Sequence, residues 1–433
     1  MIVTKFGGSS LSCEEQFKKV KAIIKDNPKR QAVVVSALGR RENEDDKLTD
    51  LLFLLHAYMR HQVNYEAIWE TVCQRFLNIK QDLNLSFDIE GELAAIKAEL
   101  DGKTLTKDYL VSRGEYLTAK LMSDYLNYDF VDASQIIIFY PNGQIDLESS
   151  RKKIEATFSN ERNIVVPGFY GAFPNGSIKL LDRGGSDVTG AILAYGLKAA
   201  KYENWTDVSG VLLADPRVVK NPVAVRELSY EELGQLSYMG ASVLHEETIY
   251  PIRSLNIPIH IKNTNDPLAD GTIIGASASP STGIAGIAGK KGYTSITIHK
   301  TYLAAEVGLL RKVMSIFERF QVNVEHVPTG IDHIGLIVSS DAIAPCRFEL
   351  LETLETELEA DRIGVKDGIV LLTVVGRQRK EGSLMGKVFQ SLEKENIPIN
   401  LITQGPRGLN MIVGIDQPDY DKAIQSLYTD LVG

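Results

Sequence analysis

The chain has 433 residues, more than one typical domain needs, so we expect two or three domains that each bury a core. Acidic and basic residues are interspersed and the net charge is -9, which argues against a nucleic-acid-binding surface because phosphate backbones attract a basic stripe. The three cysteines lie far apart and near no histidine cluster. They therefore predict neither disulfides nor a metal site and fit a reducing cytoplasm. No stretch approaches the length of a membrane span, so a soluble protein is expected. Since the charge pattern disfavours nucleic acid, small-molecule chemistry is the expected function.

The first predicted strand covers residues 2–6 and runs into a glycine loop at residues 7–10. A Ser-x-x-Glu pattern at residues 12–15 is typical of a helix start, so this loop joins a strand to a helix. Lys5 lies at the carboxyl end of the strand, where open α/β sheets place their ligands, and its ammonium suits a phosphate. Taken alone, Lys5 is better explained as a solvated side chain.

A second strand is predicted at residues 31–37, which are continuously apolar and β-branched like buried parallel strands. It places Ser36 at the same edge of the sheet. A charged loop follows over residues 40–47, and residues 49–50 can cap the next helix. Residues 59–110 are polar and helix-periodic, which indicates an insert for packing or interaction without chemistry of its own.

The segment Ser112-Arg113-Gly114-Glu115 is predicted to open a further helix. This interpretation places Glu115 in the first turn, where a glutamate ordinarily just complements the helix dipole.

A second glycine loop joins a predicted strand at residues 164–169 to a helix that ends at Lys198. Residues 183–187 of this loop read Arg-Gly-Gly-Ser-Asp, and the serine or the aspartate can cap the helix. Unpaired amides and the positive end of the helix dipole point the same way in such a loop, so it can bind an anion. One loop of this kind is more often an ordinary connection, but two of them favour a phosphate site.

Residues 202–207 predict another strand, and polar segments follow at Thr206-Asp207 and at residues 214–217. His245 is interpreted as a packing residue rather than a base. A glycine- and serine-rich stretch at residues 271–292 indicates a domain boundary. The alternation of strands and helices before it predicts a doubly wound α/β domain with a mainly parallel sheet.

The last part of the chain repeats itself with an offset of 75 residues (388 − 313 = 409 − 334 = 75). Each repeat reads strand, helix, strand, strand, helix, which is the ferredoxin-like arrangement. Neither repeat has a nucleophile or a metal-binding cluster, so binding or dimerisation is expected there rather than catalysis.

The glycine loops, Lys5 and the charged loop ends all map to one sheet edge, as nucleotide-dependent phosphoryl transfer requires. The chain has neither a Walker A motif nor the six-position glycine fingerprint of Rossmann dehydrogenases. A carboxylate acceptor, with a pKa of about 4, would be ionised at neutral pH and would need no general base.

Together these motifs resemble the aspartate kinases of the amino acid kinase family. The matching segments are Lys5-Phe6-Gly7-Gly8-Ser9-Ser10, Val35-Ser36-Ala37, Gly114-Glu115, Arg183-Gly184-Gly185-Ser186-Asp187, Thr206-Asp207-Val208-Ser209-Gly210-Val211 and Ala214-Asp215-Pro216-Arg217. The repeats resemble the tandem ACT regulatory domains of that family. The resemblance implies an amino-acid-kinase-type α/β sandwich over residues 1–290 and ACT domains over residues 291–433. These domains would cover about 293–365 and 366–433, with the second inserted in the first and the final helix completing the earlier one.

The implied activity is ATP-dependent phosphorylation of the β-carboxylate of L-aspartate to 4-phospho-L-aspartate, the first step towards lysine, threonine and methionine. Lys5 would contact the transferred phosphoryl group and Asp187 would position Lys5. Arg183 would hold the substrate α-carboxylate and Glu115 its ammonium. The other implied substrate positions are Ser36, Thr49 and Ser186. The implied nucleotide positions are Lys5, Gly7, Gly8, Ser9, Thr206, Asp207 and Arg217. Mg2+ would ride on the ATP phosphates, without a protein cage.

The resemblance also implies an amino-acid effector, lysine or threonine or both, between the first ACT unit and its mate in a homodimer or higher oligomer. Backbone amides at a helix start would take its carboxylate and Glu325 its ammonium. The implied effector positions are Leu303, Gly308, Leu309, Leu310, Asn323, Val324 and Glu325. Packing alone is the alternative explanation for the leucines.

Two departures from the family pattern concern nucleotide contacts. Leu212 stands where the family often has tyrosine, and Ser242 where it has lysine. We therefore expect an active enzyme with a modified nucleotide site. Two alternatives remain open: a sibling kinase acting on glutamate or N-acetylglutamate, and a catalytically silent amino-acid sensor.

Overall fold

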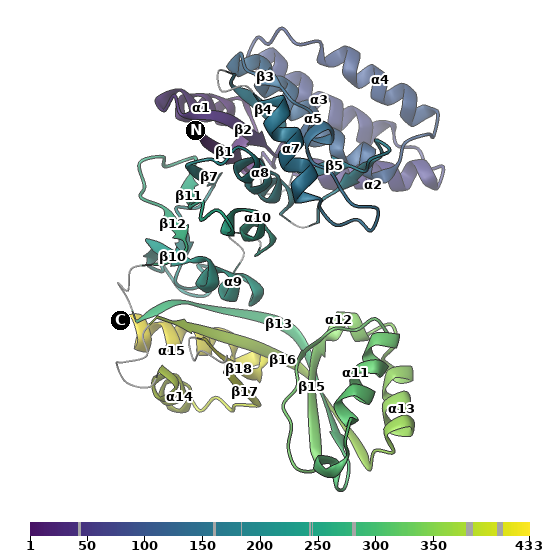
Figure 1. Ribbon diagram of the computed structural model, residues 1–433, viewed down its shortest axis with the longest axis vertical. Helices are drawn as coiled ribbons and strands as arrows, with labels where there is room; N and C mark the ends of the chain where they lie inside the picture. Colours follow the sequence, from purple (N-terminus) through teal and green to yellow (C-terminus); the bar gives the residue numbers. More distant parts are fainter. Residues whose placement is uncertain are drawn as a thin grey trace. The chain divides into compact units, whose positions relative to one another are not determined.

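The computed structural model describes residues 1–41, 45–158, 162–182, 184–241, 244, 246–278, 283–377, 384–404 and 410–433. Its internal contacts divide the chain into two units (Figure 1). The first comprises Met1–Val211, Ala224–Gly234 and Ser242–Ser279. The second comprises Leu212–Val223, Gln235–Ala241 and Pro280–Gly433.

The first unit is built on an eight-stranded sheet with the order β10-β12-β11-β7-β1-β2-β4-β3. Its neighbouring strands run parallel except for the antiparallel pair β11 and β12. The strands are β1 (Ile2–Phe6), β2 (Arg30–Val35), β3 (Asp129–Phe130), β4 (Ile164–Pro167), β7 (Lys201–Thr206), β10 (Glu227–Ser229), β11 (Ile259–Asn263) and β12 (Thr272–Gly275). The mainly parallel sheet predicted from the sequence is confirmed, and the apolar run in β2 is buried because helices cover both faces.

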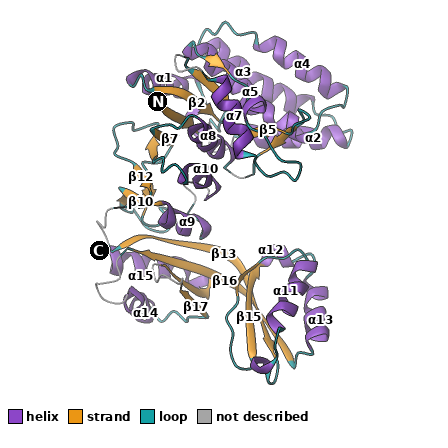
Figure 2. Cartoon of the chain, viewed as in Figure 1, coloured by secondary structure: helices purple, strands orange, loops and turns teal. Residues whose placement is uncertain are grey.

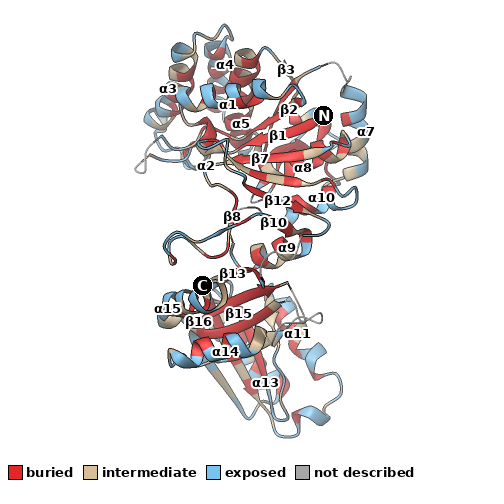
Figure 3. Ribbon diagram, turned by 90° about the vertical axis from the view of Figure 1, so that its left-hand side faces the viewer, coloured by how far each residue is buried: buried red, intermediate tan, exposed pale blue. Residues whose placement is uncertain are grey.

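Helices α1 (Glu14–Asp26) and α5 (Lys107–Leu126) cover one face of this sheet, and α8 (Gly185–Gly196) covers the other, as Figure 3 shows for the buried strands between them. The 59–110 segment forms most of a helical layer on α5, made by α2 (Leu48–Arg60), α3 (Glu66–Asp82) and α4 (Ile89–Asp101). Helices α7 (Leu147–Thr157) and α10 (Ile249–Arg253) pack beside α8. The helical insert is thus used for packing, because its apolar side is buried.

Shorter elements connect these layers. They are the 3-10 turns η1 (Gly8–Leu11) and η2 (Glu246–Thr248), helices α6 (Ala133–Ile136) and α9 (Tyr230–Tyr238), the hairpin β5 (Tyr170–Ala172) with β6 (Ile178–Leu180), and the pair β8 (Val211–Leu212) with β9 (Ala224–Val225). Among the described residues, none of the helices is both long and apolar enough to cross a bilayer.

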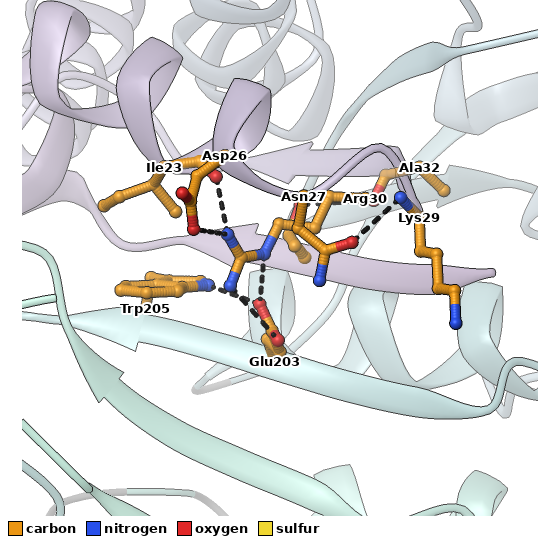
Figure 4. Close-up of polar contacts among 9 residues, drawn as sticks. Ile23, Asp26, Asn27, Lys29, Arg30, Ala32, Glu203 and Trp205 are labelled. Atoms are coloured by element: carbon orange, nitrogen blue, oxygen red, sulfur yellow. Dashed lines mark hydrogen bonds and ion pairs between the residues drawn. The ribbon is translucent and has the colours of Figure 1, made fainter. Parts of the chain in front are cut away.

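A buried ion pair joins β2 to β7 across the face of the sheet that α1 covers. Arg30 Nε donates to Glu203 Oε2 at 2.8 Å, and Trp205 Nε1 donates to the same oxygen at 3.0 Å (Figure 4). Arg30 Nη1 also reaches the backbone oxygen of Ile23 in α1. These contacts join β2 and β7, the two neighbours of β1, to each other and to helix α1.

The second unit contains a six-stranded sheet with the order β14-β15-β13-β16-β18-β17, in which every pair is antiparallel (Figure 2). The strands are β13 (Ile284–His299), β14 (Val324–His326), β15 (His333–Ser339), β16 (Arg362–Gly376), β17 (Leu401–Gln404) and β18 (Asn410–Asp416). The main helices are α11 (Leu309–Arg319), α13 (Arg347–Leu358), α14 (Leu384–Lys394) and α15 (Tyr420–Val432), with short turns η3 (Leu303–Ala305), α12 (Ser340–Ile343) and η4 (Gln417–Asp419).

The predicted internal repeat is present. The series β13, α11, β14, β15, α13 is followed by β16, α14, β17, β18, α15, and both ends of α11 and α14 are 75 residues apart (384 − 309 = 394 − 319 = 75). Two ferredoxin-like units are therefore present, as the sequence predicts, and they share one sheet.

The nesting of these two units is the opposite of the expected one. Residues 293–299 of β13 pair with β15, whereas residues 284–290 pair with the part of β16 that lies beside β18. The later unit therefore includes a strand that precedes the earlier one. Helix α15 packs on α14 and on this strand, where a Cβ on Gly289 would meet the Tyr420 ring. It thus completes the later unit, because β13 and β16 are long enough to serve both units.

Candidate active site

The carboxyl ends of β7, β1 and β2 meet at one edge of the first unit's sheet. The chain leaves β1 for β2 on one side through α1 and later returns to β7 on the other side through α8. Ligands of open α/β sheets bind where the strand order reverses in this way. Lys5 of β1 pairs in register with Asn204 of β7 and with Val34 of β2, so it lies at that point.

Two loops touch backbone to backbone at this edge. A Cβ on Gly8 would lie 3.1 Å from the oxygen of Ala37, and a Cβ on Gly39 would overlap the backbone of Gly8. The Gly7 amide donates to the oxygen of Trp205 at 3.0 Å. Any larger side chain would separate the loop after β1 from the loop after β2.

The first turn of α8 brings a carboxylate to Lys5. Gly184 precedes this helix with a φ of 72°, a conformation that glycine adopts without strain, and the Asp187 amide donates to its oxygen. Lys5 Nζ lies 2.6 Å from Asp187 Oδ1, and both side chains are largely buried. Asn204 Nδ2 donates to the same oxygen at 2.9 Å. A fixed cation thus lies at the sheet edge, held by a carboxylate.

Glu115 lies in the middle of α5, which begins at Lys107 with Thr106 as its cap, so the predicted first-turn position is wrong. It cannot complement the dipole from there. The residue is 3% exposed, and its Oε2 has no hydrogen-bond partner in the described structure. Burial raises the pKa of this carboxyl to about 8, while a hydrogen bond from the Ala37 backbone and the charge of Lys5 act in the opposite direction. A cationic group of a ligand would pair with this carboxyl and offset the cost of burying its negative charge.

The other residues predicted to bind substrate lie around the same loops. Ser36 follows β2 and its amide donates to the Phe6 oxygen at 3.1 Å. Thr49 lies half-buried in the first turn of α2, which begins at Leu48, so it does not cap that helix. Ser186 is buried at the start of α8, close against Gly168 at the end of β4. Arg183, Ser242 and His245 lie outside the described residues.

The proposed nucleotide positions fall in both units. Thr206 ends β7, and its hydroxyl donates to the exposed Asp207 at 3.1 Å. The Thr206 oxygen accepts from the Thr264 amide, and the Thr264 hydroxyl lies 2.7 Å from that of Ser10 in the glycine loop. Arg217 belongs to the second unit, where its exposed guanidinium pairs with Asp215 at 2.6 Å.

The residues predicted to bind an effector all lie in the second unit. Gly308 precedes α11 with a φ of 83° and no side chain caps that helix, so its first amides remain available to a carboxylate. Leu303 and Leu309 are buried in the core of the earlier repeat, which supports a packing role, whereas Leu310 is 47% exposed. Val324 and Glu325 lie in β14 directly after the exposed Asn323. The Glu325 carboxylate accepts a hydrogen bond from the Tyr238 hydroxyl.

Comparison with known proteins identifies the family to which this chain belongs. Residues 1–263 match the amino acid kinase family and residues 372–431 match the ACT domain. Aspartokinase 3 of Bacillus subtilis is 33% identical over 99% of this chain and 98% of its own length. The chain belongs to the aspartokinase family.

Solved structures of aspartokinases support the same family assignment. The aspartate kinase of Clostridium acetobutylicum is 41% identical, with a TM-score of 0.93 over the full length of both chains. Escherichia coli aspartokinase III, solved with aspartate and ADP, shares the fold with a TM-score of 0.83 at 24% identity. The α/β kinase domain and the ACT units expected from the sequence are therefore those of an aspartokinase.

Sequence reasoning missed two residues of this aspartokinase site. Asn204 and Tyr202 are buried polar side chains of β7, and both bond to Asp187. The available signal was an asparagine at the centre of a predicted strand, because asparagine is depleted in strands and needs partners when buried.

Proposed function

We infer that the chain is an aspartate kinase that transfers the γ-phosphoryl group of ATP to the β-carboxylate of L-aspartate. A carboxylate oxygen attacks the γ-phosphorus, the bond from that phosphorus to the oxygen bridging to the β-phosphate breaks, and ADP leaves. The acceptor carboxylate is already ionised at neutral pH, since its pKa is about 4, so no base has to remove a proton. The observation that carries this function is a fixed Lys5–Asp187 pair beside a buried carboxylate of Glu115 that lacks a partner at one oxygen.

Each charged residue has a role in this proposal. Lys5 stabilises the charge on the transferred phosphoryl oxygens, and Asp187 holds the lysine in place. Glu115 receives the ammonium of aspartate, which supplies the cation that its buried oxygen lacks. Arg183 takes the α-carboxylate through its planar fork. The substrate pocket is completed by Ser36, Thr49 and Ser186.

The nucleotide lies against the glycine loop in this proposal. The backbone of Gly7, Gly8 and Ser9 faces its phosphates, with Thr206 and Asp207 beside them at the end of β7 and Arg217 as a further contact. Mg2+ is carried by the ATP phosphates.

For regulation, we propose that lysine or threonine binds at the start of α11, with its carboxylate on the free amides after Gly308. The ACT units would pair two chains into a homodimer or a higher oligomer. A structure of Escherichia coli aspartokinase III with lysine and aspartate supports an amino-acid effector in this family. The three cysteines are unpaired, which supports the reducing cytoplasm as the proposed compartment.

The sibling kinase is the main alternative. An N-acylated substrate has no ammonium, so it would leave the buried carboxylate of Glu115 without a partner, and this favours an amino acid with a free amine. The silent sensor would have no use for a buried lysine at the phosphate loop. The paired Lys5 and Asp187 therefore favour an active enzyme.

The test is ATP-dependent acyl-phosphate formation trapped with hydroxylamine. L-aspartate, L-glutamate and N-acetyl-L-glutamate are compared, each with and without lysine or threonine. Turnover confined to L-aspartate is expected, and the inhibition data identify the effector. Turnover with N-acetyl-L-glutamate would favour the sibling kinase. A folded protein that binds an effector without any turnover would be a sensor.

A further inference from the structure

Strand β7 presents two polar side chains to α8. Alternate residues of a strand point to the same face, so Tyr202 and Asn204 share one face while Glu203 and Trp205 share the other. Figure 4 shows Glu203 bound to both Arg30 and Trp205, on the face that α1 covers. Asn204 pairs in register with Lys5 of the neighbouring strand β1. The face towards α8 therefore places Tyr202, Asn204 and Lys5 close together.

Both β7 side chains bind Asp187, each at a different atom. Asn204 Nδ2 donates to Oδ1 at 2.9 Å, the oxygen that also binds Lys5 Nζ at 2.6 Å. The Tyr202 hydroxyl donates to the backbone oxygen of Asp187 at 3.1 Å. A Cβ on Gly190 would lie 2.6 Å from the Tyr202 hydroxyl, so a glycine one turn along α8 leaves room for this contact.

The two side chains that donate in these contacts are buried. Asn204 is 3% exposed and Tyr202 is fully buried. Water cannot substitute for a lost donor at such a site, so a hydrogen bond there fixes orientation more firmly than it would on the surface. Asn204 is also neutral, so it orients the carboxylate of Asp187 without competing with Lys5 for its charge.

We propose that Tyr202 and Asn204 form a two-point clamp on Asp187, which through that residue holds Lys5 in line with the phosphoryl group. The clamp rests on the proposed function, since it needs Lys5 to act in phosphoryl transfer. Tyr202 and Asn204 are positioning residues that need not touch substrate. Tyr202 fixes the start of α8, and Asn204 fixes the carboxylate oxygen that anchors the lysine.

The expected signature is a loss of kcat without a matching loss of binding. Misplacing a catalytic group by about 1 Å can cost on the order of 100-fold in rate. We expect Asn204→Leu to lower kcat by about 10- to 100-fold and Tyr202→Phe by about 3-fold, with the KM for aspartate and for ATP within about 3-fold of wild type. Leucine keeps the branched shape of asparagine, although it is larger, and donates no hydrogen bond.

Asn204→Asp gives a second readout that a purely structural role would not produce. Two neighbouring carboxylates share a proton, and the protonated one can donate to the other as the asparagine amide does. The groups facing this position are Lys5 of β1, Asp187 of α8 and Tyr202 of β7, with Glu115 of α5 close enough to interact with Lys5. The ratio of the kcat of Asn204→Asp to that of wild type should therefore rise as the pH falls.

Asn400→Leu is the matched control. Asn400 Nδ2 donates to Asp416 Oδ1 at 2.9 Å in the second unit, the same chemical contact at a place where the clamp has no part. Its kcat should equal that of wild type. All variants are assayed as full-length chains by hydroxylamine trapping, with thermal unfolding as the check on folding.

Three outcomes separate the possibilities. A wild-type chain without aspartyl phosphate formation would remove the proposed function and the clamp with it. An active wild type with Asn204→Leu within about twofold in kcat would overturn the clamp alone. If Asn204→Leu does not fold, the test rests on the other two variants. The clamp would then be overturned if Tyr202→Phe has the kcat of wild type and the kcat of Asn204→Asp relative to wild type does not change with pH.

Discussion

Replacing Glu115 by glutamine is expected to stabilise the substrate-free protein, and more so as the pH rises. Burial raises the pKa of this carboxyl from 4.5 to about 8. Between these values the folded protein holds a proton that the unfolded chain has lost, so folding stability falls as the pH rises and levels off above about 8. Glutamine has no charge to bury and avoids this loss.

The size of the effect follows from the two pKa values. One pKa unit corresponds to about 1.36 kcal/mol, so the gap between 4.5 and about 8 costs about 5 kcal/mol above pH 8. At pH 6 only the part between 4.5 and 6 has been lost, about 2 kcal/mol. The unfolding free energy of Glu115→Gln relative to wild type should therefore grow by about 3 kcal/mol between pH 6 and pH 9.

Urea unfolding followed by tryptophan fluorescence measures this quantity for the first unit, because both tryptophans, Trp69 and Trp205, lie there. Glu99→Gln, at an exposed glutamate of α4, is the control and should show no trend with pH. At pH 9, saturating L-aspartate should raise the unfolding free energy of the wild-type protein but not that of Glu115→Gln, since only the carboxylate can pair with the substrate ammonium. A pH-independent difference between wild type and Glu115→Gln would refute the reasoning.

Three further predictions concern the phosphate edge and its support. Lys5→Met should lower kcat on the order of 1,000-fold with folding intact, and a loss below tenfold by hydroxylamine trapping would contradict its assigned role. Glu203→Gln leaves a buried arginine without its ion pair and should reduce the urea unfolding free energy by about 3 to 5 kcal/mol, and a loss below about 1 kcal/mol would exclude a stabilising pair. Gly39→Ala places a methyl group on the backbone of Gly8 and should raise the KM for ATP, whereas Gly234→Ala, which meets nothing within 4 Å, should not. An equal KM in both glycine variants would show that the loop contact does not shape the nucleotide site.

Local patterns in the sequence account for much of the fold. The apolar run of β2, both glycine loops and the 75-residue repeat depend on neighbouring residues, so they could be read without knowing what packs against them. The ends of helices were harder to predict from the sequence. Helix α5 begins at Lys107, where Thr106 caps it, well before the predicted start at Ser112. Helix α2 begins at the buried Leu48, just ahead of its predicted cap, and packs on α5.

The sequence alone determined which residues could carry the chemistry, since Lys5, Glu115 and Asp187 stand in motifs of the aspartokinase family. Only the tertiary structure decided how they meet. The register of β1 against β7 brings Asn204 beside Lys5, and the start of α8 adds Asp187 at 2.6 Å. The burial of Glu115 and the nesting of the ACT units likewise depend on segments far apart in the chain. The local periodicity of a sequence predicts which way a side chain points. The partner that this side chain meets depends on strand register and on packing between segments far apart in the chain, and a short stretch of sequence does not specify either.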